Sequence, residues 1–261
     1  MWPLSATRRK RLELHAQGAH IRQGDYNDAA SLVAAFQGVA TVLLISTSEL
    51  DHALRVQQHR HAIDAAKQAG VRRVIYTSVV NPAPTSHFAA SPGHFATEEY
   101  LRASGLAYTV FRNALYLDLV PMLVGAEAVS SGHIYFAAGE GKVSYALRAD
   151  IAQALANALT TENHENHVYD IAAGPAYSMQ DVAATLSGVT GQPVQYVAIS
   201  GEDMAARMRQ HHVPEAMIDL MSEMASALWA NELNAPSPAL EQLLGHAPTD
   251  LKTHLQYVYN K

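Results

Sequence analysis

Short apolar runs alternate along the first half of the chain with longer stretches in which apolar residues recur at helical spacing. Strands are predicted over Ala40–Ser46, Val71–Ser78 and Leu106–Arg112. Helices are predicted between them, over Asp51–Ala69 and His94–Ser104, and each is followed by a glycine where a helix stop is expected. Repeated strand-helix units of this kind predict a parallel sheet.

The second half carries a different pattern. A helix is predicted over Leu117–Ser130 and another over Asp150–Leu159, with strands over His133–Phe136 and His167–Ala172. From Ser178 the pattern is mostly helical. We therefore predict an α/β fold, with a sheet domain over residues 1–175 and a smaller, mostly helical substrate or lid region over 176–261.

Composition narrows the function classes. The 261 residues are 49% apolar and 16% charged, which is typical of a packed globular protein. The formal charge is −6, and basic residues are dispersed except over Arg8–Arg11. A protein that binds nucleic acid directly needs a basic stripe to neutralise phosphates, so we expect no such ligand.

The absence of cysteine excludes disulfides, cysteine nucleophiles and zinc-thiolate sites. Fourteen histidines are present, but none has the spacing of a zinc site, and we predict no metal. No apolar run reaches the ~20 residues that span a bilayer. We expect a cytoplasmic protein that does not enter a membrane.

Six segments of the chain form an ordered set: Gly24–Asp28, Leu43–Glu49, Ala65–Ser78, Tyr108–Asp118, Gly139–Ala152 and Glu162–Ala172. Taken together, they resemble the NmrA-like atypical short-chain dehydrogenases, in particular bacterial NAD(P)H:quinone oxidoreductases and triphenylmethane reductases. The likeness covers roughly residues 8–250.

The resemblance implies a Rossmann-like, doubly wound parallel sheet with a dinucleotide lying across the carboxyl ends of its strands. It implies NADP or NAD as cofactor, with NADPH slightly preferred, and a flat aromatic or quinone-like substrate. The activity implied is hydride transfer to a quinone or a cationic dye. An NmrA-like regulator that senses dinucleotide without turnover is the alternative, and a homodimer is left open.

Two candidate cofactor residues lie near the amino terminus. Asp25 and Tyr26 follow the segment His20–Gly24, which we predict as a short strand. A carboxylate or an aromatic ring at a strand end can meet the edge or face of an adenine. Alternatively, Asp25 caps a helix that begins near Ala29.

Small hydroxyl residues follow the next two strands. Ser46, Thr47 and Ser48 come just after one strand, where hydroxyls can bind a nicotinamide ribose, or where they form a loop with a local cap. Thr77 and Ser78 end the following strand. In the family that the chain resembles, their position borders the nicotinamide and the substrate.

The tyrosine and lysine that donate a proton in most short-chain dehydrogenases are missing. The resemblance places Ala90 and His94 at their positions. His94 is a candidate for a ribose contact or for proton donation, or it is a surface histidine of its helix. Asn113 and Tyr116 correspond to residues that line the nicotinamide and substrate pocket, although Tyr116 fits plain packing almost as well. Ser78, His94 and Tyr116 are therefore the catalytic candidates.

The amino terminus departs from the family. No glycine-rich turn for a pyrophosphate precedes Gly24, and Thr7–Gly18 resembles the helix after the family's second strand, which leaves Trp2–Ala6 as a stub. We expect a truncated sheet that lacks its first two strands, from a late start codon or a shortened gene, and an inactive product is an alternative. Pairing of His20–Gly24 beside Ala40–Ser46 would close the gap.

The helical tail is rich in methionine, a flexible and polarisable side chain. These residues predict an adaptable apolar wall for a flat aromatic substrate, with ordinary core or dimer packing as the alternative. They are Met204, Met208, Met217, Met221 and Met224.

Overall fold

A computed structural model describes residues 8–49 and 51–260 of the chain. They form two compact units, each assembled from separate stretches of sequence. Unit 1 contains the described residues up to Ser78, with Pro92–Val110 and Asn163–His167; unit 2 contains Val79–Ser91, Phe111–Glu162 and the described residues from Val168 on. The boundary at residue 175 between a cofactor domain and a substrate region stays a prediction.

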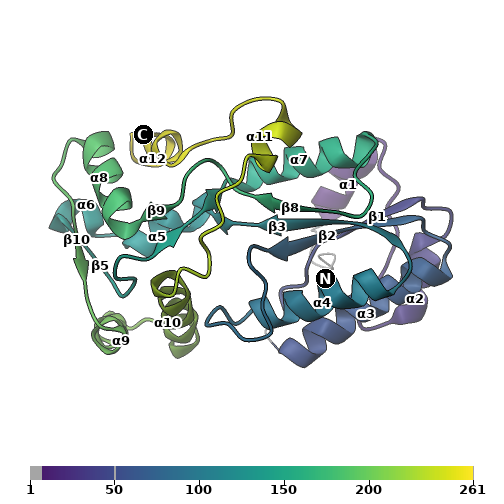
Figure 1. The fold of residues 1–261 in the computed structure, drawn as a ribbon, viewed down its shortest axis with the longest axis horizontal. Helices are drawn as coiled ribbons and strands as arrows, with labels where there is room; N and C mark the ends of the chain where they lie inside the picture. The colour runs from purple at the N-terminus through teal and green to yellow at the C-terminus, as the bar shows by residue number, and fades with distance from the viewer. Residues whose placement is uncertain (1–7, 50, 261) are drawn as a thin grey trace. The chain divides into compact units, whose positions relative to one another are not determined.

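Unit 1 has the alternation of strands and helices that the sequence predicts (Figure 1). Strands β3 and β8 begin here and continue into unit 2. The elements are α1 (Arg8–Ala16), α2 (Ala29–Phe36), β1 (Thr41–Leu44), α3 (His52–Gln68), β2 (Arg73–Val79), α4 (Ser91–Ala103), β3 (Ala107–Asn113) and β8 (His167–Ile171).

The strands form one sheet in the order β1-β2-β3-β8. Strands β1 and β2 are parallel, with Thr41 opposite Arg73 and Leu44 opposite Tyr76. Helix α3 connects these two neighbours, as a parallel crossover requires. The predicted α/β class with a parallel sheet is confirmed.

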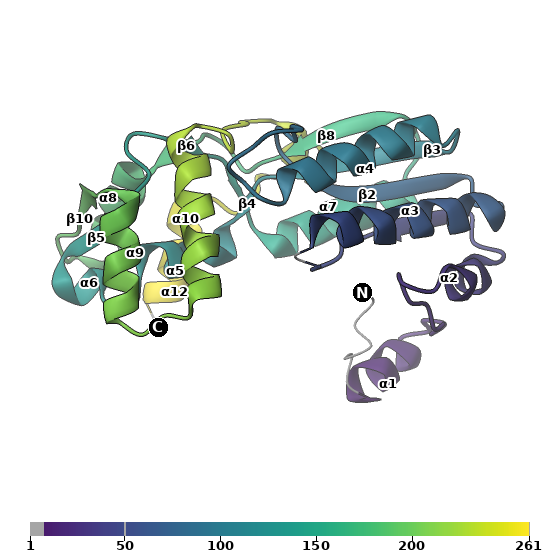
Figure 2. The same cartoon turned by 90° about the horizontal axis from the view of Figure 1, so that it is seen from below.

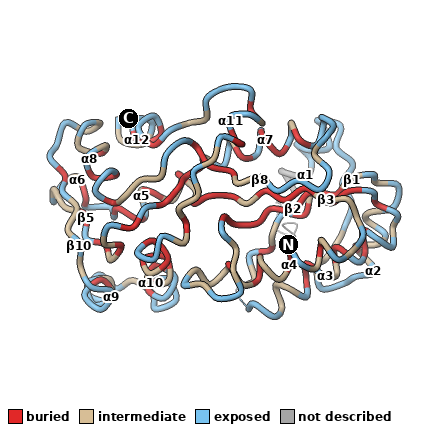
Figure 3. Tube along the Cα trace, viewed as in Figure 1, coloured by how far each residue is buried: buried red, intermediate tan, exposed pale blue. Residues whose placement is uncertain are grey.

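Helix α3 explains why this part of the chain folds as it does. Its first turn is capped by Asp51, whose Oδ1 accepts the Leu54 N–H at 2.9 Å. Its buried face packs on β2, which is buried along its whole length (Figure 3). Residues of this face recur at helical spacing: Gln58, His59, Ala62, Ile63, Ala65 and Ala66.

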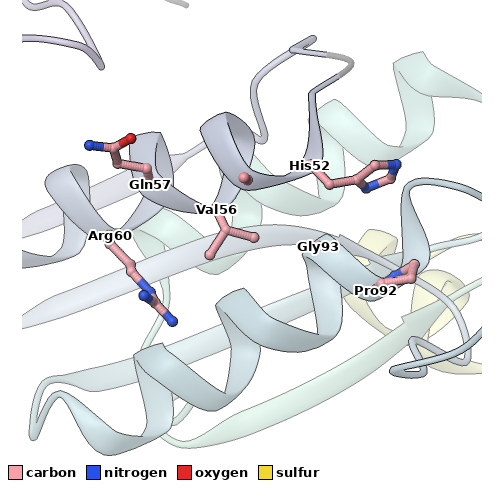
Figure 4. Close-up of a pocket in the computed structure, with 7 residues that line it drawn as sticks. His52, Val56, Gln57, Arg60, Pro92 and Gly93 are labelled. Atoms are coloured by element: carbon pink, nitrogen blue, oxygen red, sulfur yellow. The ribbon is translucent and has the colours of Figure 1, made fainter.

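Helices α3 and α4 lie side by side (Figure 2). A Cβ at Gly93 would meet the Arg55 Cδ at 3.5 Å and the Val56 Cγ2 at 3.8 Å, which are ordinary van der Waals distances, so α4 packs closely against α3 at this position. A groove of about 650 Å³ runs between them, with His52, Val56, Arg60 and Pro92 along it (Figure 4).

The amino-terminal part corrects one prediction. His20–Gly24 is not a strand, and the only bridge nearby joins Asp25 to Asp28. The Arg22 guanidinium donates to the Ala35 and Gln37 carbonyls at 2.8 and 2.6 Å, which holds the segment against α2. Within the described residues β1 therefore pairs with β2 alone, and the predicted pairing beside β1 is wrong. The helix predicted over Thr7–Gly18 is confirmed as α1.

The stub Trp2–Ala6 lies outside the residues that the structure describes.

Unit 2 is built of helices and very short sheets. Strand β10 pairs in parallel with β5 and β4 with β7, while β6 and β9 are antiparallel. The elements are β4 (Leu115–Tyr116), η1 (Leu117–Leu119), α5 (Val120–Val124), α6 (Ala128–Ser131), β5 (His133–Phe136), β6 (Lys142–Val143), β7 (Tyr145–Ala146), α7 (Arg148–Thr160), β9 (Tyr177–Ser178), α8 (Met179–Thr190), β10 (Gln195–Ala198), α9 (Gly201–Gln210), α10 (Glu215–Trp229), α11 (Ala239–Leu244) and α12 (Leu251–Tyr259).

The predicted helix over Leu117–Ser130 is wrong as a single element. Gly125, at φ +85°, ends α5, and α6 begins three residues later. The predicted helix after Ser178 is confirmed, and Ser178 and Asp181 form a capping box. None of the described helices is long and apolar enough to cross a bilayer.

Candidate functional site

The carboxyl ends of β1 and β2 bring two of the predicted residues together. Because Leu44 lies opposite Tyr76, the residues that follow them reach the same edge of the sheet. There the Ser46 N–H donates to the Thr77 Oγ1 at 2.9 Å. Thr77 therefore fixes the start of the loop that carries Ser46, Thr47 and Ser48.

His59 of α3 also binds this loop, and its role was not predicted from the sequence. Its Nε2 accepts the Thr47 N–H at 3.1 Å, so the proton of the neutral ring sits on Nδ1 and is donated to the Thr97 Oγ1 at 2.9 Å. Burial lowers the pKa of His59 to about 3, assisted by the Arg55 charge. His59 is thus a neutral side chain whose two ring nitrogens both form hydrogen bonds, one to the Thr47 N–H and one to the Thr97 hydroxyl.

His94 of α4 is buried, so the alternative of a surface histidine is wrong. Its Nδ1 lies 2.7 Å from the hydroxyl of Tyr76, which is fully buried in β2. With the His59 proton on Nδ1, we assign the Tyr76 hydroxyl as the donor to the His94 Nδ1, and this assignment places the His94 proton on Nε2. That Nε2–H donates to no described residue.

Burial also controls the charge of this pair. It lowers the pKa of His94 to about 3, with Arg55 and His59 adding to the effect, and it raises the pKa of Tyr76. Neither side chain changes charge near neutral pH. His94 therefore offers a neutral N–H donor and cannot act as an imidazolium acid there.

Ser78 is engaged with a buried carboxylate. Its Oγ donates to the Glu98 Oε1 at 2.7 Å, and the Glu98 Oε2 accepts from the Arg102 guanidinium at 2.7 Å. Glu98 is only 1% exposed, so the guanidinium balances its charge. The Ser78 hydroxyl is left with acceptor capacity only, and its contact joins β2 to α4.

Near the amino terminus, the structure separates two roles. The Tyr26 hydroxyl donates to the Ile45 carbonyl at 3.0 Å, and burial raises the pKa of Tyr26 to about 12. Asp28, and not Asp25, caps α2 by accepting the Ala30 and Ser31 N–H groups, so the capping alternative for Asp25 is wrong. The Asp25 carboxylate accepts the Asn27 N–H at 2.9 Å.

Asn113 and Tyr116 belong to unit 2. Asn113 ends β3 and is buried, and its Oδ1 has no hydrogen-bond partner among the described residues. An unpaired buried acceptor costs about 1–3 kcal/mol, so the Asn113 Oδ1 has the capacity to accept a hydrogen bond that the described residues do not supply. Tyr116, in β4, has the Arg148 guanidinium 6.0 Å from its ring centre.

The described residues fit a dinucleotide in part. In unit 1, neutral hydroxyls and N–H groups at the ends of β1 and β2 suit a ribose and a nicotinamide amide. In unit 2, taken by itself, the unpaired Asn113 Oδ1 can accept from an amide donor. Within residues 8–49, no glycine-rich turn joins a strand to a helix, so a pyrophosphate cradle of that kind is not found there. Among the described residues, no three histidine or acidic side chains gather to hold a metal.

Comparison with known proteins gives a consistent picture. Quinone oxidoreductase 2 of Escherichia coli K12 is 36% identical over 247 residues, which are 95% of this chain and 85% of that protein. The crystal structure of an Escherichia coli NADPH-dependent quinone oxidoreductase with NADPH superposes with a TM-score of 0.88 at 36% identity, covering 97% of this chain and 88% of that one.

A third similar protein is the Citrobacter triphenylmethane reductase complexed with NADP(H), with a TM-score of 0.87 and 32% identity over 96% of this chain and 87% of that one. The NmrA-like family matches residues 5–258. The match covers nearly the whole chain, and the chain belongs to the NmrA-like family.

Proposed function

We propose that the protein is an NAD(P)H-dependent reductase that passes a hydride to a flat conjugated acceptor such as a quinone or a cationic triphenylmethane dye, in the cytoplasm. The observation that carries the proposal is the neutral hydrogen-bond network of His59, Tyr76 and His94 beside the ends of β1 and β2. Membership of a family with NADPH-bound reductases supports it.

The charge state of this network suits such acceptors. Tyr76 and His94 both stay neutral near pH 7, because burial moves their pKa values away from neutrality. A cationic dye that takes a hydride becomes neutral without any proton, and a quinone that takes a hydride becomes an anion that solvent can protonate. Neither reaction needs a strong acid from the protein.

When bound, NAD(P)H supplies the hydride, and the chain supplies position. In this proposal the Ser46, Thr47 and Ser48 segment and Thr77 contact the nicotinamide ribose. His94 donates its Nε2–H to the cofactor, and Asn113 accepts from the nicotinamide amide.

The remaining candidates complete the proposed site. Asp25 and Tyr26 face the adenine, Ser78 borders the nicotinamide as an acceptor, and Tyr116 contacts the substrate. NADPH is preferred over NADH because the similar solved structures hold NADPH or NADP(H). These residue roles and this preference are parts of the proposal.

The test begins with titration of the protein with NADPH and NADH, followed by nucleotide fluorescence and melting temperature together. Oxidation of the bound nucleotide is then measured with 1,4-naphthoquinone and with malachite green. Saturable binding with turnover supports the proposal. Binding without turnover would favour a dinucleotide sensor, and no binding would refute both functions for this chain.

The variant His94→Leu removes the N–H donor and fills the buried position with an apolar side chain. It should weaken NADPH binding or slow turnover about fivefold, since one hydrogen bond to a buried partner is worth about 1 kcal/mol. His20→Leu, at an exposed position, is the matched control.

A further inference from the structure

Unit 2 contains a cavity of about 470 Å³, which we call the methionine cavity. Its size is within the range of small-molecule sites. Helices α5, α6, α9 and α10 and strand β5 supply its walls. The lining includes Met122, Leu123, Val124, Phe136, Met204, Met208 and Met221.

Most of this wall is apolar and much of it is firmly placed. Phe136, Met204 and Met221 are buried, so they form a fixed floor, whereas Met122 is 42% exposed. Methionine side chains adapt their shape and make favourable sulfur contacts with aromatic rings. The predicted methionine wall is therefore present for Met204, Met208 and Met221. Met217 and Met224 do not line the cavity.

An arginine that lines this cavity has no carboxylate partner among the residues that the structure describes. The Arg207 guanidinium carbon lies 4.2 Å from the ring centre of Tyr135, a cation–π arrangement, and His133 stacks on the same ring with 5.7 Å between the ring centres. No described carboxylate pairs with Arg207. Its neighbour Arg209, in contrast, is bound by Glu215 at 2.9 and 3.0 Å.

One acidic residue also lines the cavity. Glu127 precedes α6 and is exposed, and no described side chain pairs with it. The Glu127 carboxylate would repel an anionic ligand, whereas Arg207 would attract it. Arg207 has the Tyr135 ring as a neighbour at 4.2 Å, whereas no described side chain pairs with Glu127, so we take Arg207 as the charge that a ligand in the cavity meets.

We propose that the methionine cavity binds a planar aromatic carboxylate or sulfonate. The ring system lies among the methionine side chains and Phe136, and the acid group accepts hydrogen bonds from Arg207. A planar anion matches both the fork of a guanidinium and a flexible apolar slot. All of the residues involved belong to unit 2, and the inference does not rest on the proposed reductase activity.

The test uses 1-anilinonaphthalene-8-sulfonate as the anionic probe and N-phenyl-1-naphthylamine as its uncharged counterpart. Both are titrated by fluorescence against the full chain, and calorimetry gives the stoichiometry. We expect one sulfonate probe per chain. Arg207→Gln should weaken sulfonate binding about tenfold and leave binding of the uncharged probe unchanged, because only the charged hydrogen bond is lost.

Three further variants sharpen the result. Arg209→Gln, two residues along the same helix, should leave sulfonate binding unchanged. Glu127→Gln should strengthen it, and Met122→Glu should abolish it by placing a like charge at the exposed edge. Melting temperatures near that of the unmodified protein confirm that each variant folds.

Three outcomes would overturn the proposal. The first is equal loss of sulfonate binding in Arg207→Gln and Arg209→Gln, and the second is no loss in either variant. The third is displacement of the probe by saturating NADPH, which would place it at a nucleotide site. Turnover of NADPH in Arg207→Gln is expected to match that of the unmodified protein, so failure of this inference and failure of the proposed reductase activity are distinguishable.

Discussion

Replacing His59 tests whether the loop after β1 is held by one buried imidazole. In His59→Leu the Thr47 N–H loses its acceptor, and Thr47 is only 5% exposed, so water does not readily replace the lost bond. The Thr97 hydroxyl is affected less, because it still donates to the Gly93 carbonyl at 2.8 Å. One orphaned backbone donor therefore dominates the cost.

Leaving a buried N–H unpaired costs about 1–3 kcal/mol. For a chain of this size each kcal/mol lowers the melting temperature by about 2–4 °C, so we expect a decrease of roughly 2–12 °C. The loop that carries Ser46 and Thr47 should also become mobile. Amide hydrogen exchange of residues 45–49 should therefore accelerate more than exchange in β2.

The assay is thermal unfolding followed by circular dichroism, together with hydrogen exchange read by mass spectrometry. His52→Leu makes the same substitution at an exposed position of the same helix and should change neither quantity. His59→Gln, whose amide oxygen can accept the Thr47 N–H, should recover part of the loss. If His59→Leu melts like the unmodified protein and protects the loop equally, the anchoring role of His59 is refuted.

Three further outcomes follow from the structure. The pKa values of His59 and His94 are about 3 in the folded chain against 6.5 for a free histidine, so the unfolded chain binds more protons below pH 6.5. The free energy of unfolding should therefore decrease as pH is lowered from 7 to 5, by on the order of 1 kcal/mol per pH unit for each histidine, and the melting temperature should decrease with it. A melting temperature that does not change over this pH range would contradict the reasoning. Gly141→Ala should abolish folding or destabilise the protein severely, because the added Cβ would clash with the Leu228 carbonyl oxygen. In Gly188→Ala, within α8, the added Cβ contacts no other atom, and the variant should raise the melting temperature by a few degrees. Equal melting temperatures of the two variants would be evidence against the close approach at Gly141. Asn113→Ala removes the unpaired Oδ1 and should weaken NADPH binding with little change in melting temperature, and unchanged affinity in a titration would count against the proposed cofactor contact.

The order of strands and helices could be predicted because each element carries its own period. Strand β2 has an apolar, largely β-branched stretch at Val74–Tyr76, and Asp51 marks the start of α3 through a local cap. The structure of His20–Gly24 was harder to predict, since it depends on Arg22 reaching two carbonyls at the carboxyl end of α2. A contact 13 or 15 residues away leaves no periodic trace in the sequence.

The candidate site was predictable to a similar depth. Strand ends were expected to meet, and the Ser46 N–H does reach the Thr77 hydroxyl. The surroundings of His94 could not be predicted, because its partner Tyr76 lies on a strand that only the tertiary fold brings beneath α4. Ser78 is similar: its position could be predicted from the strand, but its hydrogen-bond acceptor is Glu98, 20 residues along the chain.

A polar residue on the apolar face of a helix carries information that periodicity alone overlooks. His59 shares its face of α3 with Ala62, Ile63 and Ala66 at spacings of three, four and seven residues. Burying an imidazole there without hydrogen bonds would cost stability, so its presence predicts buried partners. The sequence cannot name them, because Thr47 and Thr97 belong to different elements. The same reasoning makes His59 the residue whose replacement most directly tests how the proposed cofactor edge is held.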